Sequence, residues 1–277
     1  MSASRCCVRC FLKLIKAAQS FSKTFYRDSR YPTSCMNSIS QSFATAFSLI
    51  ASGDGALWSI VGRSLWVSGV ATVLASGLGV LLGAWLAVAR FQGRGAVLAV
   101  LNTMLAIPSV VVGLLVYLML SRSGPLGYLG WLFSVKAMVL AQALLVLPIV
   151  AALTRQLVED ADVLHGEQLQ SMGAGSFMRG ALHVWDERFA VLMVLLAAFG
   201  RAIAEVGAVM VVGGNIEGFT RVMTTAIALE TSKGDLPLAL GLGLVLLTMV
   251  LLLNALVAGL RALLGGSTSD ASKGVRV

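Results

Sequence analysis

The hydrophobic residues of this chain gather in five long runs that are almost free of charge. A bilayer core of about 30 Å needs about 20 helical residues to cross it, so an apolar run of roughly 18 residues or more predicts a transmembrane helix. The runs that reach this length cover residues 64–89, 95–120, 137–154, 189–215 and 236–260. The pattern therefore predicts an all-α, polytopic membrane bundle with about five core transmembrane helices.

Glycine and proline inside these runs predict how the helices pack. The first run contains Gly69, Gly77, Gly79 and Gly83, which would let another helix approach closely. Pro108 lies within the second run, where it removes one backbone hydrogen bond, and the third run contains Pro148. A membrane helix tolerates such a proline where neighbouring helices or water satisfy the freed carbonyl. We therefore expect a kink at Pro108, inside the bundle.

Residues 39–61 offer an alternative sixth span. The turn signal Ser52-Gly53-Asp54-Gly55 interrupts this segment, and each half is too short to cross a bilayer. We expect an interfacial helix instead, which starts at about Leu57 and leads into the first span.

The fourth run holds Arg201 and Glu205, the only charged residues inside any of the five runs. Their spacing of four residues would place both side chains on one face of a helix, where they can neutralise each other. A charge at bilayer depth costs about 2.5–3.5 kcal/mol on insertion scales, so it normally faces protein or a polar path. Two interpretations stay open, namely a neutral clamp that fixes helix packing and a direct role in a gate or permeation path.

Composition supports a membrane protein and argues against other classes. The 277 residues are 57% hydrophobic and 12% charged, whereas soluble domains carry roughly 25% charged residues. The net charge of +8 comes from basic residues that flank apolar runs, as membrane anchors do, so nucleic acid is not an expected partner. The chain has only two histidines and lacks a glycine-rich phosphate loop, so we do not expect an enzyme.

The first 35 residues differ from the rest of the chain. They contain all four cysteines and seven of the 21 basic residues, against one acidic residue. Cys7 and Cys10 have the spacing of a metal or redox motif, but no second pair or histidine lies near them, so no metal site is predicted. We interpret residues 1–35 as a basic N-terminal extension that is untranslated, if synthesis starts at Met36, or disordered, or bound to anionic lipid. Residues 36–277 then form the transmembrane domain.

The longest and most charged loop between spans covers residues 155–188. Its stretch E-Q-L-Q-S-M-G-A-G has Glu167 six residues before Gly173, so a short helix can end or turn at that glycine. An ordinary solvated loop is the alternative. If the chain starts at Met36 and crosses five times, the side that holds this loop has eight basic residues against five, which favours a cytoplasmic location.

Three motifs together resemble a known family. The spacing from Glu167 to Gly173 is similar to the coupling motif E-A-A-x-x-x-G of bacterial ABC importer permeases, although Gln168 and Leu169 replace the two alanines. The stretch F-G-R-A-I-A-E-V-G-A at 199–208, followed by G-G-N-I at 213–216, resembles the permeases for molybdate, sulfate and tungstate. The stretch T-R-V-M-T-T-A-I-A-L-E-T-S-K-G-D at 220–235 resembles the tungstate branch. The similarity covers roughly residues 57–260.

This resemblance implies a type I (MetI-like) ABC importer permease for an oxyanion, with tungstate favoured over molybdate or sulfate. It implies a bacterial inner membrane and, as partners, an ABC ATPase, a periplasmic or lipid-anchored oxyanion-binding protein, a second copy of the chain and the bilayer. No cofactor is expected in this chain, since ATP and Mg would bind the ATPase. A secondary transporter is the alternative class, but the inverted repeats typical of one are not found.

The resemblance also assigns candidate site residues. Glu167, Gly173 and Ala174 would couple the chain to the ATPase, with Glu167 pairing to a basic residue there. Asn215, Thr220 and Arg221 would line the ion path or gate in the segment from Gly213 to Pro237, which we expect to be non-helical backbone around a cavity. The Arg221 guanidinium suits an oxyanion because it donates in a fork and keeps its charge. Pairing of Arg221 with Glu217 or Glu230 is the alternative.

Overall fold

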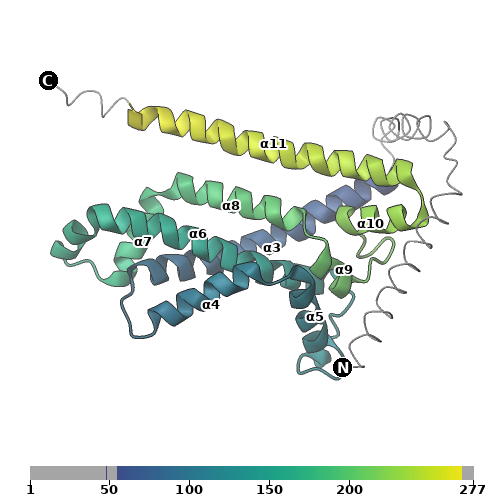
Figure 1. The fold of residues 1–277 in the computed structure, drawn as a ribbon, viewed down its shortest axis with the longest axis horizontal. Helices are drawn as coiled ribbons and strands as arrows, with labels where there is room; N and C mark the ends of the chain where they lie inside the picture. The colour runs from purple at the N-terminus through teal and green to yellow at the C-terminus, as the bar shows by residue number, and fades with distance from the viewer. Residues whose placement is uncertain (1–47, 49–54, 270–277) are drawn as a thin grey trace, which may run out of the picture. The chain divides into compact units, whose positions relative to one another are not determined.

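The computed structural model describes residue 48 and residues 55–269, so the predictions for the N-terminal extension lie outside the described residues. The described part is helical and contains no strand, which confirms the all-α prediction. Its helices are α3 Gly55–Val88, α4 Arg94–Ala106, α5 Ser109–Leu120, the short 3-10 helix η1 Gly127–Leu129, α6 Val135–Ser171, α7 Ser176–Asp186, α8 Arg188–Ile203, α9 Gly207–Gly213, α10 Met223–Lys233 and α11 Leu236–Ser269 (Figure 1).

Three helices, α3, α6 and α11, are each long and apolar enough to cross a membrane. Two further crossings arise if α4 with α5, and α8 with α9, each count as one span. The first pair bends by 101° at its break and the second pair by 57°. The five predicted spans therefore correspond to three continuous helices and two broken ones.

The predicted kink at Pro108 is a complete break. Ile107 adopts an extended conformation, with φ −67° and ψ 130°, and Pro108 lies directly before α5. The residue before a proline is pushed out of the helical region by the proline ring, so a helix commonly ends there. Pro148, in contrast, lies inside α6 without ending it.

The predicted separate interfacial helix before the first span is absent from the described residues. A single helix, α3, runs from Gly55 to Val88, and Leu57 and Val61 in its first turns are buried with Ile203, Met223 and others against α10 and α11. The helix continues through Gly62 without interruption, so this stretch and the first span form one helix.

Glycines let α3 and α6 pack closely. A Cβ atom added at Gly83 would lie 2.5 Å from the carbonyl oxygen of Ala151, and one added at Gly79 would lie 2.9 Å from Cβ of Val150. The prediction of close helix approach is therefore confirmed at these two positions. At Gly69 and Gly77 no described residue lies within 4 Å of the added atom, so the prediction is not tested there.

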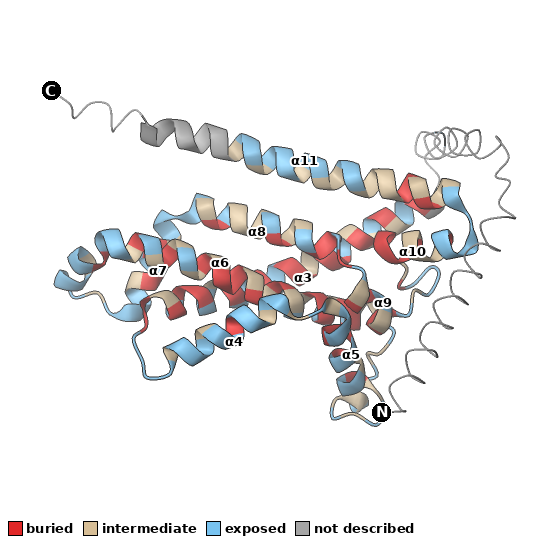
Figure 2. Cartoon of the chain, in the orientation of Figure 1, coloured by how far each residue is buried: buried red, intermediate tan, exposed pale blue. Residues whose placement is uncertain are grey.

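The two short helices that follow the breaks pack against each other. A Cβ atom at Gly113 of α5 would lie 2.7 Å from Cα of Ala208 in α9, and both helices share a cluster with the start of α6. The last helix, α11, is buried mainly near its beginning, at Ala239 and Leu242. Much of the rest of its described surface is exposed (Figure 2), which is typical of a helix that faces lipid.

Candidate functional site

The charged pair of the fourth span lies at a break and not on one continuous helix, so that part of the prediction was wrong. Helix α8 ends at Ile203 and α9 begins at Gly207, which leaves Glu205 between them. Arg201 Nη1 still donates to Glu205 Oε2 at 2.9 Å. The other carboxylate oxygen, Oε1, accepts from the backbone amides of Gly207 at 3.0 Å and Ala208 at 3.4 Å. The first amides of a helix have no intrahelical partner, so Glu205 also caps α9.

The two members of this pair differ in exposure. The Glu205 side chain is 5% exposed, whereas the Arg201 side chain is 55% exposed. The carboxylate is therefore held inside the bundle, and the guanidinium reaches the surface of the chain at the middle of an apolar run.

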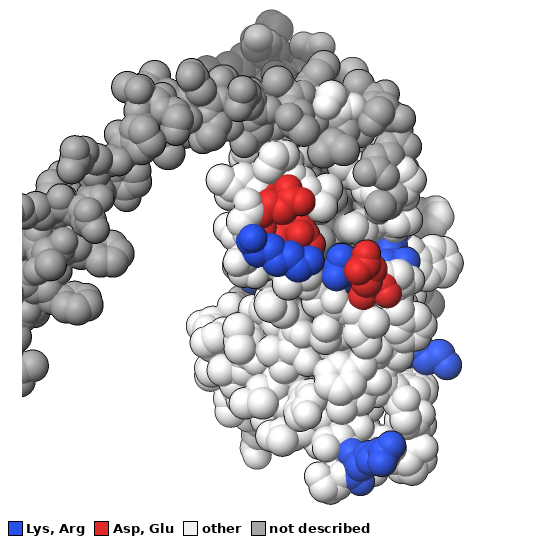
Figure 3. Space-filling model, turned by 90° about the vertical axis from the view of Figure 1, so that its right-hand side faces the viewer, with Lys and Arg blue, Asp and Glu red and all other residues white. Residues whose placement is uncertain are grey.

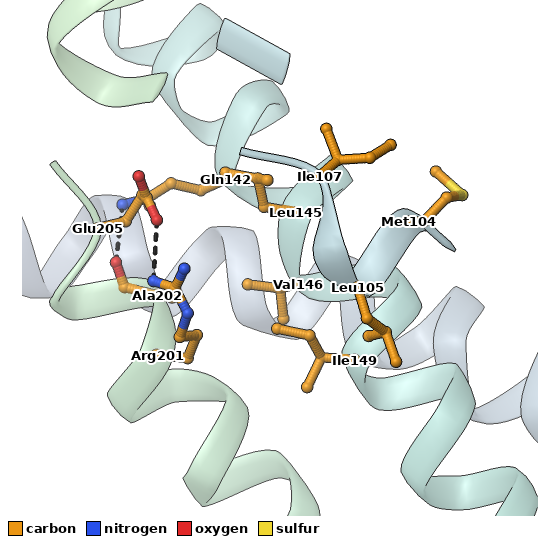
Figure 4. A pocket seen from close by; sticks show the side chains of 10 residues that line it. All are labelled: Met104, Leu105, Ile107, Gln142, Leu145, Val146, Ile149, Arg201, Ala202 and Glu205. Carbon is orange, nitrogen blue, oxygen red and sulfur yellow. Dashed lines mark hydrogen bonds and ion pairs between the residues drawn. The ribbon is translucent and has the colours of Figure 1, made fainter. Parts of the chain in front are cut away.

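A small pocket lies where the breaks of both bent spans meet (Figure 4). Its volume is about 50 Å³. The lining comes from the end of α4 and its break (Met104, Leu105 and Ile107), from α6 (Gln142, Leu145, Val146 and Ile149) and from the end of α8 and its break (Arg201, Ala202 and Glu205). Polar groups thus face a pocket whose other walls are aliphatic.

Gln142 is a site residue that the sequence analysis missed. Its Nε2 donates to the carbonyl oxygen of Ala202 at 3.1 Å and lies 3.4 Å from Oγ of Ser68. Its Oε1 is buried and has no hydrogen-bond partner among the described residues. A signal was present in the sequence, because Gln142 is the only amide side chain of the third apolar run.

The segment from Gly213 to Pro237 contains a helix, α10, so the expectation of wholly non-helical backbone was wrong. Thr220 and Asn215, two of the predicted path residues, form hydrogen bonds that stabilise the loop before α10. Thr220 Oγ1 donates to the carbonyl oxygen of Gly213 at 2.6 Å and accepts from the amide of Ile216 at 2.9 Å. Asn215 has a positive φ of 51°, and its Nδ2 donates to the carbonyl oxygen of Thr225 at 3.2 Å.

Arg221 lies near both of the acidic residues considered for it. Its Nη1 is 3.7 Å from Glu217 Oε1 and 3.9 Å from Glu230 Oε1, while Glu230 also accepts from Lys233 at 2.9 Å. The two contacts of Arg221 are longer than ordinary charge-assisted hydrogen bonds. Arg63 joins the group by donating to the carbonyl oxygens of Gly218 and Arg221. On the side that carries α10, Figure 3 shows a band of acidic and basic side chains across a largely uncharged face.

The predicted coupling loop is a helical hairpin made by the second half of α6 and by α7. Gly173 adopts a φ of +85° after the end of α6, which confirms the predicted helix end. The amide of Gly173 donates to the carbonyl oxygen of Gln170, and that of Ala174 donates to the carbonyl oxygen of Leu169. These two hydrogen bonds form a Schellman motif, in which glycine tolerates the left-handed conformation.

Asp162 ties the two helices of the hairpin together. Arg179 Nη2 donates to its carboxylate oxygens at 2.7 and 2.6 Å, and the buried His183 lies with Nε2 3.1 Å from Oδ1. Asp162 lies beyond Thr154, where the apolar run ends. Burial raises the pKa of its carboxyl, but the hydrogen bonds and charges of Arg179 and His183 outweigh that effect and lower the pKa below its ordinary value of 3.8.

The outer surface of the hairpin exposes apolar side chains although it lies outside the apolar runs. Glu167 is exposed, and its side chain forms no hydrogen bond with another described residue. The large exposed apolar residues of the hairpin are Val163, Leu164, Met172, Phe177, Met178, Leu182 and Trp185. An exposed apolar surface of this kind marks a site of interaction with protein or membrane.

The long apolar helices and broken spans define an all-helical, multi-pass membrane protein. No family model matches the chain. The chain is 38% identical over 230 residues to a tungstate uptake system permease protein of Peptoclostridium acidaminophilum, covering 82% of this chain and 99% of that protein. It is 41% identical over 210 residues to a probable anion ABC transporter permease protein of Haloferax volcanii, covering 74% and 90%. A molybdenum transport system permease protein of Escherichia coli is 30% identical over 200 residues, covering 64% and 82%. This chain belongs to the family of ABC transporter permease proteins.

Proposed function

We propose that this chain is the membrane-spanning subunit of an ATP-driven importer whose cargo is tungstate. The observation that carries the proposal is the similarity to a tungstate uptake permease along 99% of that protein's length. A second tungstate uptake permease, from Campylobacter jejuni, is 36% identical over 89% of its length, which supports the same cargo. Molybdate and sulfate are the alternative cargoes, because permeases named for molybdenum and sulfate match at 28–32% identity.

The hairpin of α6 and α7 is the proposed docking element for a separate ATPase subunit, which binds ATP and Mg. Its exposed apolar side chains favour a protein partner at this place. In this proposal Glu167 pairs with a basic residue of the ATPase, while Gly173 and Ala174 form the turn that presents both helices. The Asp162–Arg179 ion pair keeps the hairpin stiff enough to transmit movement.

A second copy of the chain completes the proposed transporter. Arg201 is 55% exposed in a single chain, although it lies in the middle of an apolar run. Exposing this charge to lipid would cost about 2.5–3.5 kcal/mol, so a protein neighbour or a polar path between two copies is the favourable cover. The transporter would lie in the inner membrane of a bacterium.

The face that carries α10 is the proposed outer end of the path. A periplasmic or lipid-anchored oxyanion-binding protein would dock there, where the charged band offers polar contacts (Figure 3). Arg221 is the proposed ion contact, because its guanidinium keeps its charge and, among the described residues, makes only long contacts, of 3.7 and 3.9 Å, with Glu217 and Glu230. Asn215 and Thr220 remain path residues in this proposal, with their side chains shaping the loop that carries Arg221.

Metal accumulation in a deletion strain tests the cargo. Cells that lack the gene for this chain should lose tungsten from a mixed tungstate and molybdate medium while they keep most of their molybdenum. Expression of the chain from a plasmid should restore the tungsten content. Equal loss of both metals, or loss of neither, would contradict the assignment to tungstate.

A further inference from the structure

We propose that the Arg201 guanidinium contacts the oxyanion as it passes the middle of the membrane, beside a pocket that holds water. This inference rests on the proposed function and adds a contact at the break of the fourth span. In this inference Arg201 contacts the ion, Gln142 lines the pocket that holds water, and Glu205 holds Arg201 in place.

The Glu205 carboxylate leaves part of Arg201 available. Three donors share this carboxylate, namely Nη1 of Arg201 and the amides of Gly207 and Ala208. The only hydrogen bond that the Arg201 side chain makes to another described residue uses Nη1, so Nη2 and Nε have no acceptor within the described part of the chain. A guanidinium presents its donors in a planar fork that matches the oxygens of a tetrahedral oxyanion.

The position of Arg201 favours an ion path over a purely structural pair. A clamp would bury both partners, but the arginine side chain is 55% exposed and the glutamate 5%. The free donors therefore lie at the surface of the chain, at a depth where lipid would be an unfavourable neighbour.

The polar lining by Gln142, Arg201 and Glu205 indicates that the adjacent pocket holds water. Nε2 of Gln142 must face the carbonyl oxygen of Ala202, because only the amide nitrogen can donate there. The amide is thus fixed with Oε1 as a buried acceptor that lacks a donor among the described residues. The pocket of about 50 Å³ exceeds the roughly 10–15 Å³ that one water needs. Water in this pocket would stay available to the passing ion (Figure 4), and a small shift of the Gln142 side chain would let this water donate to Oε1.

Partial neutralisation by Glu205 suits a transient contact. A conducting site must attract the ion enough to admit it and release it again quickly. An unpaired arginine in a region of low dielectric would hold a dianion too tightly, whereas a guanidinium that already shares a carboxylate attracts it less strongly.

The test uses the full transporter, with its ATPase and binding protein, in proteoliposomes that are supplied with tungstate. R201Q should lower tungstate uptake about tenfold, since a hydrogen bond to a charged group is lost. ATP hydrolysis stimulated by the binding protein should stay within about twofold of the wild type. R122Q makes the same change at an exposed loop position and should leave both rates unchanged.

A double variant guards against a folding defect. R201Q leaves Glu205 without its charged partner, whereas R201Q/E205Q restores a neutral pair and should show the thermal stability of the wild type with the same loss of uptake. Wild-type uptake in the double variant, or an equal fall in uptake and ATP hydrolysis in both variants, would overturn the role of Arg201. Failure of the wild-type transporter to accumulate tungstate would instead overturn the proposed function, and this inference with it.

Discussion

At the scale of single residues, the sequence predicted which groups come together better than it predicted their geometry. The spacing of Arg201 and Glu205 correctly indicated a contact, but they meet across a helix break. The spacing cannot distinguish a pair on one helix from a pair across a break. At the break, Glu205 accepts from an amide of α9, and this contact is not visible in the spacing. The unsatisfied oxygen of Gln142 was equally hidden, since it depends on contacts with two other helices.

Replacing Glu205 by alanine should lower the stability of the folded protein. The change strands the amides of Gly207 and Ala208, and each buried donor left unsatisfied costs about 1–3 kcal/mol. The melting temperature of the purified protein in detergent measures the effect. Exchanging Arg201 and Glu205 should recover only the part due to the ion pair, because arginine cannot accept from the amides.

Glu217→Ala is the matched control for this prediction. The Glu217 side chain is 84% exposed, and its contact with Arg221 is 3.7 Å, so little stability should be lost. Equal melting temperatures for the Glu205 and Glu217 variants would show that the capping contacts contribute nothing.

Asp162→Asn should loosen α7 from α6. The neutral amide keeps the shape of the side chain but weakens the bonds from Arg179, and we expect a loss of about 1–3 kcal/mol in the attachment of the hairpin. Limited proteolysis between residues 172 and 188 should be faster in this variant. Asp160→Asn changes an exposed carboxylate two positions away, and the protease should cleave this variant at the wild-type rate. Similar cleavage of both variants would argue against a tie through Asp162.

At the scale of helices, apolar runs predicted where helices occur, and tertiary contacts decided where they break. Pro108 and Pro148 both lie in apolar runs, yet only Pro108 ends a helix. The residues after it pack tightly on the second break, because a Cβ atom at Gly207 would lie 2.7 Å from Cγ2 of Val110. Contacts between residues so distant in sequence are not visible in a local pattern.

Gly83→Ala should destabilise the packing of α3 on α6. The added methyl group would lie 2.5 Å from a backbone oxygen, so the helices must shift, and overpacking of this kind typically costs about 1–3 kcal/mol. Gly77→Ala, in the same helix but facing open space, should be neutral or slightly stabilising. Melting temperatures of the two variants measure the difference, and a Gly83 variant as stable as the Gly77 variant would disprove close packing there.

At the scale of the whole molecule, the number of crossings depends on whether the bent pairs span the bilayer. Three of the described helices are each long and apolar enough to cross, and five crossings require that α4–α5 and α8–α9 each traverse the bilayer. The apolar length of a run cannot decide this, because a re-entrant pair needs the same composition as a span.

Labelling with a membrane-impermeant thiol reagent distinguishes the two topologies. The native cysteines, all within the first 35 residues, would first be replaced by serine. With five spans, Gln92→Cys and Ser123→Cys should label from opposite sides, and His165→Cys should label from the cytoplasm, on the same side as residue 92. Labelling of positions 92 and 123 from one side would mean that α4–α5 turns back within the bilayer.

The continuity of α6 has a mechanical consequence. Its 37 residues make a rod of about 55 Å, and that rod carries Gln142 near one end and the Schellman turn at the other. A displacement of the hairpin is therefore transmitted to the pocket beside Gln142 along one helix, without an intervening loop. The helix bends most easily at Pro148, because the proline ring nitrogen has no hydrogen to donate to the preceding turn. Bending at Pro148 would turn a push on the hairpin into a tilt beside Arg201.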